Sequence, residues 1–269
     1  MTKSHAEMIR IFKEESAYGT PNPKKGFFAF LGRTKPLFYS RFVSIILKGA
    51  KIARKGKYSN EVWIDNSLDT IDILEKAGAR FDISGLDNLR EEPDKGYVII
   101  ANHMSTLETV ALPAMVQTNR NVTFIVKDSL VKGNIFGAIM RARDPIVVGR
   151  KNPREDLEHV LSSGEEILKS GTSLIIFPQS TRDNRFDPKK FNSLGVKLAK
   201  RAKTKVIPLA LKTDCWGNGK WIKEYGRIDV SKTIYFHFDK PIDIVGNGKE
   251  AHQSIVEFIA KKQAAWAAS

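Results

Sequence analysis

The stretch Ser173–Phe177, which reads Ser-Leu-Ile-Ile-Phe, contains one of two continuous apolar runs that decide the fold class. The second is Tyr97–Ala101, which reads Tyr-Val-Ile-Ile-Ala. Strands that are covered on both faces have such unbroken apolar sequences, and they occur in parallel sheets with helices on both sides. Outward from these two runs, strand-like segments alternate with segments of helical periodicity. We therefore predict an α/β fold with a mixed, largely parallel central sheet flanked by helices.

The remaining elements follow from the same two periodicities. Residues 61–78 carry apolar side chains at helical spacing and end at Gly78, a residue that commonly follows the last helical turn. The predicted strands are 80–84, 97–101, 122–126, 145–148, 173–177, 206–211 and 233–238. The predicted helices after residue 60 are 61–78, 105–116, 134–141, 154–170, 193–202 and 251–268. The sequence has no internal repeat, and no long linker separates these helices and strands. Residues 61–269 are therefore predicted to form one α/β domain.

The basic charge of the chain is concentrated at its N-terminus. The 269 residues carry a formal net charge of +14, and residues 1–60 alone hold 13 Lys and Arg against three acids. They also contain the aromatic runs Phe27–Leu31 and Leu37–Tyr39 and a short helical pattern before residue 16. Apolar and basic residues interleaved at helical spacing are typical of helices in the interface of an anionic membrane. We expect 1–60 to be a basic, Phe-rich amphipathic helical membrane-docking segment, although a helix packed on the domain has the same pattern.

Several classes of protein are disfavoured by what the sequence lacks. Cys215 is the only cysteine, which rules out an internal disulfide and a cysteine zinc site and suits a reducing compartment. No apolar run approaches the roughly 20 residues of a spanning helix, and no secretory signal is visible. The histidines have no metal-ligand spacing, and no nucleic-acid-binding motif accompanies the basic charge. We expect no metal, no nucleic-acid partner, and a peripheral or monotopic location at the cytoplasmic face of a membrane.

A histidine and a carboxylate stand directly after the strand predicted over 97–101. The sequence there is Ala101-Asn-His103-Met-Ser105-Thr-Leu-Glu108, which puts the acid in the first turn of the next helix. At that spacing the carboxylate can hold one imidazole nitrogen and leave the other free to take a proton from a substrate hydroxyl. The residues also fit a capping box, in which Glu108 only binds backbone N–H groups near Ser105. Spacing alone leaves both interpretations open.

Two further strand ends carry basic side chains. Residues 177–182 read Phe-Pro-Gln-Ser-Thr-Arg, and this loop offers backbone N–H groups, hydroxyls and the Arg182 guanidinium to an anion. Residues 145–151 form a predicted strand followed by Gly149, Arg150 and Lys151. A solvated loop with no ligand has the same composition. Because working groups in open α/β sheets gather at the carboxyl ends of the strands, both ends are candidate binding regions.

The order of these blocks resembles the glycerophospholipid acyltransferase family, of the lysophosphatidic acid type. The resemblance covers residues 97–211: the His103-x4-Glu108 block, the strand end at Gly149-Arg150, the loop 177–182, and a fourth block, Val206–Ala210. It implies an O-acyltransferase that moves a fatty acyl chain from acyl-CoA or acyl carrier protein to a hydroxyl of a lysophospholipid such as 1-acyl-glycerol-3-phosphate. It implies no cofactor beyond this co-substrate, and it makes residues 61–269 the acyltransferase domain.

The resemblance also implies a role for each matched residue. His103 is the general base, and Glu108 orients it. The two arginines bind the phosphate of the acceptor, and the loop beside them lines the substrate site. The substrate-binding residues that the resemblance implies are Arg150, Gln179, Ser180, Thr181 and Arg182.

Three positions depart from the commonest pattern of that family. Glu108 stands where Asp is usual, which keeps the charge but lengthens the reach. Gln179 and Ser180 stand where the family has Glu and Gly, so this loop lacks one carboxylate and gains a side chain. Two alternatives follow. Beside the function that the resemblance implies, the chain could be a catalytically altered peripheral membrane-binding protein on the same fold, or an acyltransferase for a non-glycerol lyso-lipid such as a lyso-aminolipid.

Overall fold

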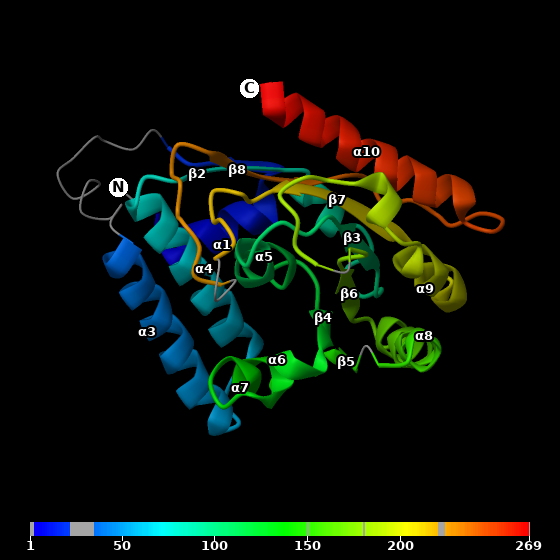
Figure 1. The fold of residues 1–269 in the computed structure, drawn as a ribbon, viewed down its shortest axis with the longest axis horizontal. Coiled ribbons are helices and arrows are strands. Elements are labelled where there is room, and N and C mark those ends of the chain that lie inside the picture. The colour runs from blue at the N-terminus through cyan, green and yellow to red at the C-terminus, as the bar shows by residue number, and fades with distance from the viewer. Residues whose placement is uncertain (1–2, 22–34, 150, 180, 220–223, 269) are drawn as a thin grey trace.

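The computed structural model describes residues 3–21, 35–149, 151–179, 181–219 and 224–268, and a mixed sheet lies at its centre (Figure 1). In the described chain eight strands follow the order β1-β2-β8-β7-β3-β6-β4-β5. The pairs β1/β2 and β7/β8 are antiparallel and the other pairs are parallel, which confirms the predicted sheet. The strands are β1 (Ala17–Gly19), β2 (Arg80–Ser84), β3 (Val98–Ala101), β4 (Val122–Lys127), β5 (Ile146–Val148), β6 (Ser173–Ile176), β7 (Val206–Lys212) and β8 (Thr233–Phe238).

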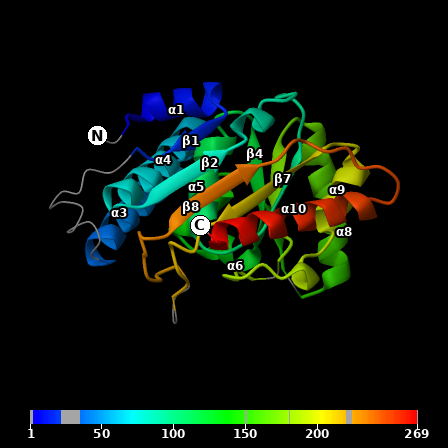
Figure 2. The same cartoon turned by 90° about the horizontal axis from the view of Figure 1, so that it is seen from above.

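Helices cover both faces of this sheet (Figure 2). The α-helices are α1 (His5–Glu14), α3 (Lys35–Arg54), α4 (Asn60–Lys76), α5 (Leu107–Val116), α6 (Asp128–Lys132), α7 (Phe136–Arg141), α8 (Pro153–Lys169), α9 (Leu194–Ala202) and α10 (Lys249–Ala268). Two 3₁₀ helices are η1 (Leu86–Leu89) and η2 (Pro188–Lys190). Side chains of α1, α3, α4 and α5 share one core cluster, and those of α8, α9 and α10 share the other. The central strands are therefore buried from both sides.

The alternation of side chains along β3 explains its continuous apolar sequence. Val98 and Ile100 point into the core under α8, α9 and α10, whereas Ile99 and Ala101 point into the core under α4 and α5. Successive residues of a strand face opposite sides of the sheet, so a strand covered on both sides needs an apolar residue at every position. The same alternation holds along β6, the other run from which the fold was predicted.

The described parts of residues 1–60 pack on the body of the protein. In α1, Met8, Ile11 and Phe12 are buried in the same core cluster as the central strands. The short strand β1, which the sequence did not predict, pairs with β2. The structure therefore shows no separation in packing at the predicted boundary of residue 60. Membrane docking by this region remains a prediction.

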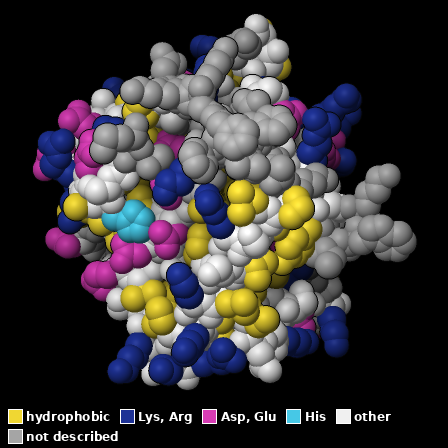
Figure 3. Space-filling view, turned by 90° about the vertical axis from the view of Figure 1, so that its left-hand side faces the viewer, with side chains coloured by type: hydrophobic (Ala, Val, Ile, Leu, Met, Phe, Trp, Pro, Cys, Tyr) yellow, Lys and Arg dark blue, Asp and Glu magenta, His cyan; other side chains and the backbone are white. Residues whose placement is uncertain are grey.

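The outer surface of α3 carries both apolar and basic side chains. Leu37 and Leu47 are 36% and 46% exposed, and basic residues lie exposed among them on the same helix. The basic residues concerned are Arg41, Lys48, Lys51 and Arg54. Figure 3 views the side of the molecule on which α3 lies and shows apolar and basic side chains interspersed there. Within the described residues no helix is both long enough and apolar enough to cross a bilayer. The aromatic run at 27–31 lies outside the described residues.

Candidate active site

The loop between β3 and α5 fixes the backbone of His103 at three points. The side chain of Asn102, which is 1% exposed, forms two hydrogen bonds with the backbone of Leu211, at 2.8 and 3.0 Å. The N–H of His103 donates to Oε1 of Gln179 at 2.7 Å, and the carbonyl of His103 accepts from the N–H of Asp183 at 2.9 Å. Strands β7 and β6 thus hold the histidine from either side, because both neighbour β3 in the sheet.

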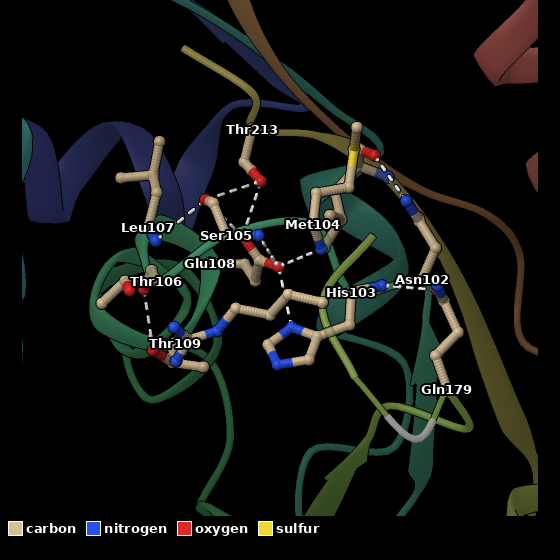
Figure 4. A network of polar contacts seen from close by, with 12 residues as sticks. Asn102, His103, Met104, Ser105, Thr106, Leu107, Glu108, Thr109, Gln179 and Thr213 are labelled. Carbon is tan, nitrogen blue, oxygen red and sulfur yellow. Dashed lines mark hydrogen bonds and ion pairs between the residues drawn. The ribbon is translucent and has the colours of Figure 1, made fainter. Parts of the chain in front are cut away.

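His103 and Glu108 lie in direct contact, as their spacing predicts (Figure 4). Nδ1 of the imidazole is 2.8 Å from Oε1 of Glu108. A buried carboxylate only accepts, so Nδ1 carries the proton and Nε2 presents a lone pair. The side chain of His103 is 16% exposed, whereas that of Glu108 is fully buried. Nε2, on the far side of the ring from Glu108, can therefore act as a base while the carboxylate orients the ring.

Glu108 makes the contacts that each of the two interpretations requires, so the geometry is compatible with both. Oε1 accepts not only from His103 but also from the N–H groups of Met104 and Ser105, at 2.6 and 2.8 Å. These N–H groups precede α5 and have no partners inside the helix, so the carboxylate caps them. The cap and the dyad reinforce each other, because the same N–H groups that the carboxylate satisfies also fix its position beneath the imidazole.

Thr213 is a member of this network that the sequence did not predict. Its hydroxyl donates to Oε2 of Glu108 at 2.6 Å, and the hydroxyl of Ser105 lies 2.9 Å from the same oxygen and 3.0 Å from Thr213 (Figure 4). Burial works against the charged carboxylate. The hydrogen bond and charge of His103, with the groups of Thr213 and Ser105, outweigh it and hold the pKa of Glu108 below its usual value. Glu108 is thus kept ionised without access to water.

An aromatic side chain closes one face of the imidazole. The ring of Phe177 stacks on His103 with centroids 4.3 Å apart and an interplanar angle of 20°. Phe124 continues the stack at 6.4 Å from Phe177. This apolar wall keeps water from that side of the ring and lowers the local dielectric, which strengthens the contact between His103 and Glu108.

The loop after β6 is brought beside His103, and two of its side chains, those of Gln179 and Arg182, already have partners. Gln179 is 6% exposed and uses its amide oxygen to hold the N–H of His103, so its predicted contact with a substrate remains a prediction. Nη1 of Arg182 lies 3.1 Å from Oε1 of Glu224, and these side chains are 14% and 41% exposed. Thr181 is exposed in the same loop. Arg182 therefore faces a partner that sequence analysis did not identify.

Two of the predicted site residues fall outside the described structure. Arg150 and Ser180 both lie in the gaps of the described ranges. In sequence, Arg150 comes after β5, which is separated from β3 by β6 and β4 in the sheet, whereas Ser180 comes after β6, which neighbours β3. Their predicted contacts with the acceptor remain predictions.

The chemistry available at this edge of the sheet is acid–base chemistry at an imidazole. Cys215 is fully buried, and burial, with smaller contributions from Asp229 and Asp214, raises the pKa of its thiol to about 12, which keeps it neutral. Among the described residues no group of three or more His, Cys, Asp or Glu side chains is placed to hold a metal ion. The candidate reactive group is therefore the His103 imidazole, which contacts the buried carboxylate of Glu108.

Comparison with known proteins gives one family and one fold. The family model described as "Acyltransferase" matches residues 80–212, from the start of β2 to the end of β7. A protein of Pseudomonas aeruginosa named 1-acyl-sn-glycerol-3-phosphate acyltransferase is 32% identical over 155 residues, which are 57% of this chain and 58% of that protein. A Mycoplasma pneumoniae protein named probable 1-acyl-sn-glycerol-3-phosphate acyltransferase is 31% identical over 127 residues, 46% of this chain and 47% of that protein. The match thus spans less than two thirds of either relative.

A solved structure shares the overall architecture. The crystal structure of PlsC from Thermotoga maritima, described as a 1-acyl-sn-glycerophosphate (LPA) acyltransferase, aligns with a TM-score of 0.67. The alignment covers 90% of this chain and 97% of that one, at 16% sequence identity. At that identity the likeness concerns the fold, which it supports over nearly the whole length.

Proposed function

Residues 80–212 of this chain belong to the acyltransferase family, and from this premise we propose that the protein transfers a fatty acyl group from an acyl thioester to a hydroxyl of a lysophospholipid. The donor is acyl-CoA or acyl carrier protein, and the acceptor is of the 1-acyl-sn-glycerol-3-phosphate type. The observation that carries the proposal is the contact of 2.8 Å between Nδ1 of His103 and a fully buried Glu108, which leaves Nε2 at the exposed edge of the sheet.

The proposed reaction uses that nitrogen as a general base. Nε2 of His103 takes the proton of the acceptor hydroxyl while the hydroxyl oxygen attacks the carbonyl carbon of the thioester. The carbon–sulfur bond then breaks, and the leaving thiolate receives the proton from the imidazolium. Glu108 stabilises the imidazolium that forms between these two steps, as a buried carboxylate does in other dyads. No covalent acyl-enzyme is needed, because the thioester is already activated.

Arg182 is the proposed ligand of the acceptor phosphate, together with Arg150, Ser180 and Thr181 as the sequence implies. Arg182 is paired with Glu224, which is 41% exposed. Solvent screens the exposed carboxylate of this pair, so a phosphate that binds the guanidinium with two hydrogen bonds can displace it.

The same ion pair favours a second candidate acceptor. An acceptor that carries both an anionic group and an ammonium group complements Arg182 and Glu224 together. This is the charge pattern of a lyso-aminolipid. Position 179 has Gln where the family pattern has Glu. Glu224, from a different loop, supplies a carboxylate beside Arg182 instead.

The outer surface of α3 is the proposed contact with the membrane. Leu37 and Leu47 are exposed there beside basic side chains, a combination that suits acyl chains and anionic headgroups. Peripheral docking at this surface supplies the lipid acceptor to the protein without a spanning helix.

Product analysis with purified protein tests the proposed reaction. Both thioester donors are offered with a panel of acceptors that includes 1-acyl-sn-glycerol-3-phosphate and a lyso-aminolipid. We expect His103→Ala to abolish acyl transfer and His159→Ala, which replaces an exposed histidine of α8, to retain it. His159→Ala should keep the thermal unfolding midpoint of the parent chain, whereas His103→Ala should stay folded with a lower midpoint, because the buried Glu108 loses a charged partner.

Two results would contradict the proposal. Turnover by His103→Ala at the parent rate would remove the base from its role. Binding of the parent chain to anionic vesicles, without acylation of any acceptor by either donor, would favour the alternative of a catalytically altered peripheral membrane-binding protein.

A further inference from the structure

A cleft lies between the C-terminal half of α10 and the loop that follows Arg182. It has a volume of about 330 Å³, and we call it the α10 cleft. One wall is the face of α10 formed by Ala260, Ala264 and Ala267, and the opposite wall is formed by Phe186 and Pro188. Small side chains on the helix leave room that larger ones would fill, and the facing ring makes the interior largely apolar.

Positive charge lies at this cleft. Arg185 is exposed on the loop wall, and Lys212, at the end of β7, lines the cleft beneath α10. The amino group of Lys212 donates to the carbonyl of Trp266 at 2.8 Å, which fixes its charge beside the helix. The cleft thus combines a largely apolar lining with two cations, and it suits a ligand that has both an apolar part and an anionic group.

Two polar contacts connect the walls of the α10 cleft to the active-site loop. From α10, Nε2 of Gln263 donates to the carbonyl of Leu211 at 2.6 Å and lies 3.9 Å from the sulfur of Met104. From the other wall, Asn184 contacts Asn218 at 3.4 Å, and Asn218 in turn donates to the carbonyl of Met104 at 2.9 Å. Met104 is the neighbour of His103, so both walls end beside the proposed catalytic base.

The arrangement of α10 explains why the cleft opens at this edge of the sheet. Figure 2 shows the C-terminal part of α10 running beside β7 and β8. Because β7 is parallel to β3, its end at Lys212 lies at the same edge as the end of β3 that leads into the His103 loop. Ligands of open α/β sheets bind at the carboxyl ends of parallel strands, and the α10 cleft meets that condition.

We propose that the α10 cleft binds the phosphopantetheine arm of the acyl thioester, and this inference rests on the proposed acyltransferase function. The arm is a narrow chain of methylene, methyl and amide groups with a phosphate at one end and the thioester at the other. Its apolar part matches the alanine face of α10 and Phe186, its amides match the side chain of Gln263, and its phosphate matches Arg185 and Lys212. Coenzyme A and acyl carrier protein share this arm.

A pair of tryptophan substitutions on α10 tests the assignment. Ala264→Trp fills the cleft, whereas Ala265→Trp places the same ring at an exposed position of the same helix that does not line it. Binding of free coenzyme A to the full chain is measured by calorimetry. We expect the dissociation constant to rise at least tenfold for Ala264→Trp and to stay within twofold of the parent for Ala265→Trp. Arg185→Glu, at an exposed loop position, should weaken binding without affecting folding.

The acyl carrier protein distinguishes the two sources of the arm. Holo acyl carrier protein, which carries the arm, should bind the parent chain more tightly than the apo form, and Ala264→Trp should abolish that difference. Equal binding of coenzyme A by the parent, Ala264→Trp and Arg185→Glu would overturn the proposal, as would no binding of either probe to the parent. Because these measurements require no turnover, they fail or succeed independently of the acyl-transfer assay.

Discussion

Replacing Thr213 by Val removes one hydroxyl from beneath the imidazole and keeps the shape of the side chain. That hydroxyl donates to Oε2 of Glu108 at 2.6 Å, and Thr213 is fully buried, so water has no access to replace it. The hydroxyl of Ser105 still reaches the same oxygen at 2.9 Å. The carboxylate thus keeps the donors from His103, Met104 and Ser105 and loses the one that ties it to the end of β7.

The size of the effect follows from the charge of the acceptor. A hydrogen bond to a charged group contributes about 1.5–3 kcal/mol, and about 1.4 kcal/mol corresponds to a factor of ten in a rate. We expect Thr213→Val to lose about 1.5–3 kcal/mol of unfolding free energy and about tenfold in kcat/KM. The expected loss in kcat/KM is smaller than the upper end of the range of about 1.5–3 kcal/mol would give, because the Ser105 hydroxyl continues to hold Glu108. The pKa of Glu108 should rise, since the Thr213 hydroxyl is one of the groups that lower it.

The assay combines urea unfolding with kcat/KM measured as a function of pH. Thr213→Ser restores the hydroxyl and should recover both quantities. Thr123→Val is the matched control: Thr123 is 4% exposed on β4, and its hydroxyl donates to the carbonyl of Arg143 at 2.6 Å, away from Glu108. It should lose stability but keep the pH profile of the parent. A parent-like kcat/KM at every pH in Thr213→Val, with Thr213→Ser indistinguishable from it, would refute the reasoning.

Further predictions concern the same site and the N-terminal packing. Glu108→Gln should lower kcat by about 10- to 100-fold, because about 1.5–3 kcal/mol of charged hydrogen bonding to the imidazolium is lost; steady-state kinetics at saturating substrates measures this. The ionised form of Glu108 stabilises the fold above the ordinary glutamate pKa of about 4.3, and this contribution disappears as the pH falls through the lower folded pKa. Unfolding midpoints of the parent should therefore approach those of Glu108→Gln as the solution is acidified from about pH 4. Arg182→Ala should raise the KM for the acceptor more than it lowers kcat, and an unchanged acceptor KM would exclude Arg182 from phosphate binding. Phe12→Ala should cost about 3–5 kcal/mol of unfolding free energy, measured by urea titration, whereas a helix that only docks on membranes would lose almost nothing.

The central strands were predictable because their burial leaves a local signal. A strand covered on both faces requires apolar residues at consecutive positions, and 97–101 and 173–177 have them. β1 left no such signal, since its three residues, Ala17–Gly19, include one buried side chain and a glycine. Its pairing with β2 is set by the packing of α1 and by the hydrogen bond of 2.6 Å from Tyr18 to Glu75.

The amphipathic pattern of residues 1–16 is compatible with two kinds of surface. The apolar face that contains Met8 and Phe12 packs against the core, although the same pattern fits a membrane interface. An apolar stripe shows that a helix buries one face, but it does not identify what that face packs against. Only the tertiary structure distinguishes the two.

In the candidate active site, contacts between residues close in sequence were predictable, whereas contacts between distant residues were not. His103 and Glu108 are five residues apart, so the geometry of a strand end and a first helical turn predicts their contact. Thr213 contributes from 105 residues beyond Glu108, and Glu224 from 42 residues beyond Arg182. The register of β3 against β7 and the path of the loop after β7 bring these residues together, and neither leaves a periodic signal in the sequence.

The two outermost strands of the sheet, β1 and β5, have three residues each. An open sheet exposes unpaired N–H and C=O groups along its borders, and long borders recruit strands from other molecules. Here each border offers too little backbone for a stable intermolecular pairing. β1 shields β2, the longer strand behind it, so a chain shortened to begin at residue 20 would uncover the three residues of β2 that pair with β1, Asp82, Ile83 and Ser84. We expect such a chain to self-associate at concentrations at which the intact protein stays dispersed, so residues 1–19 would contribute to solubility.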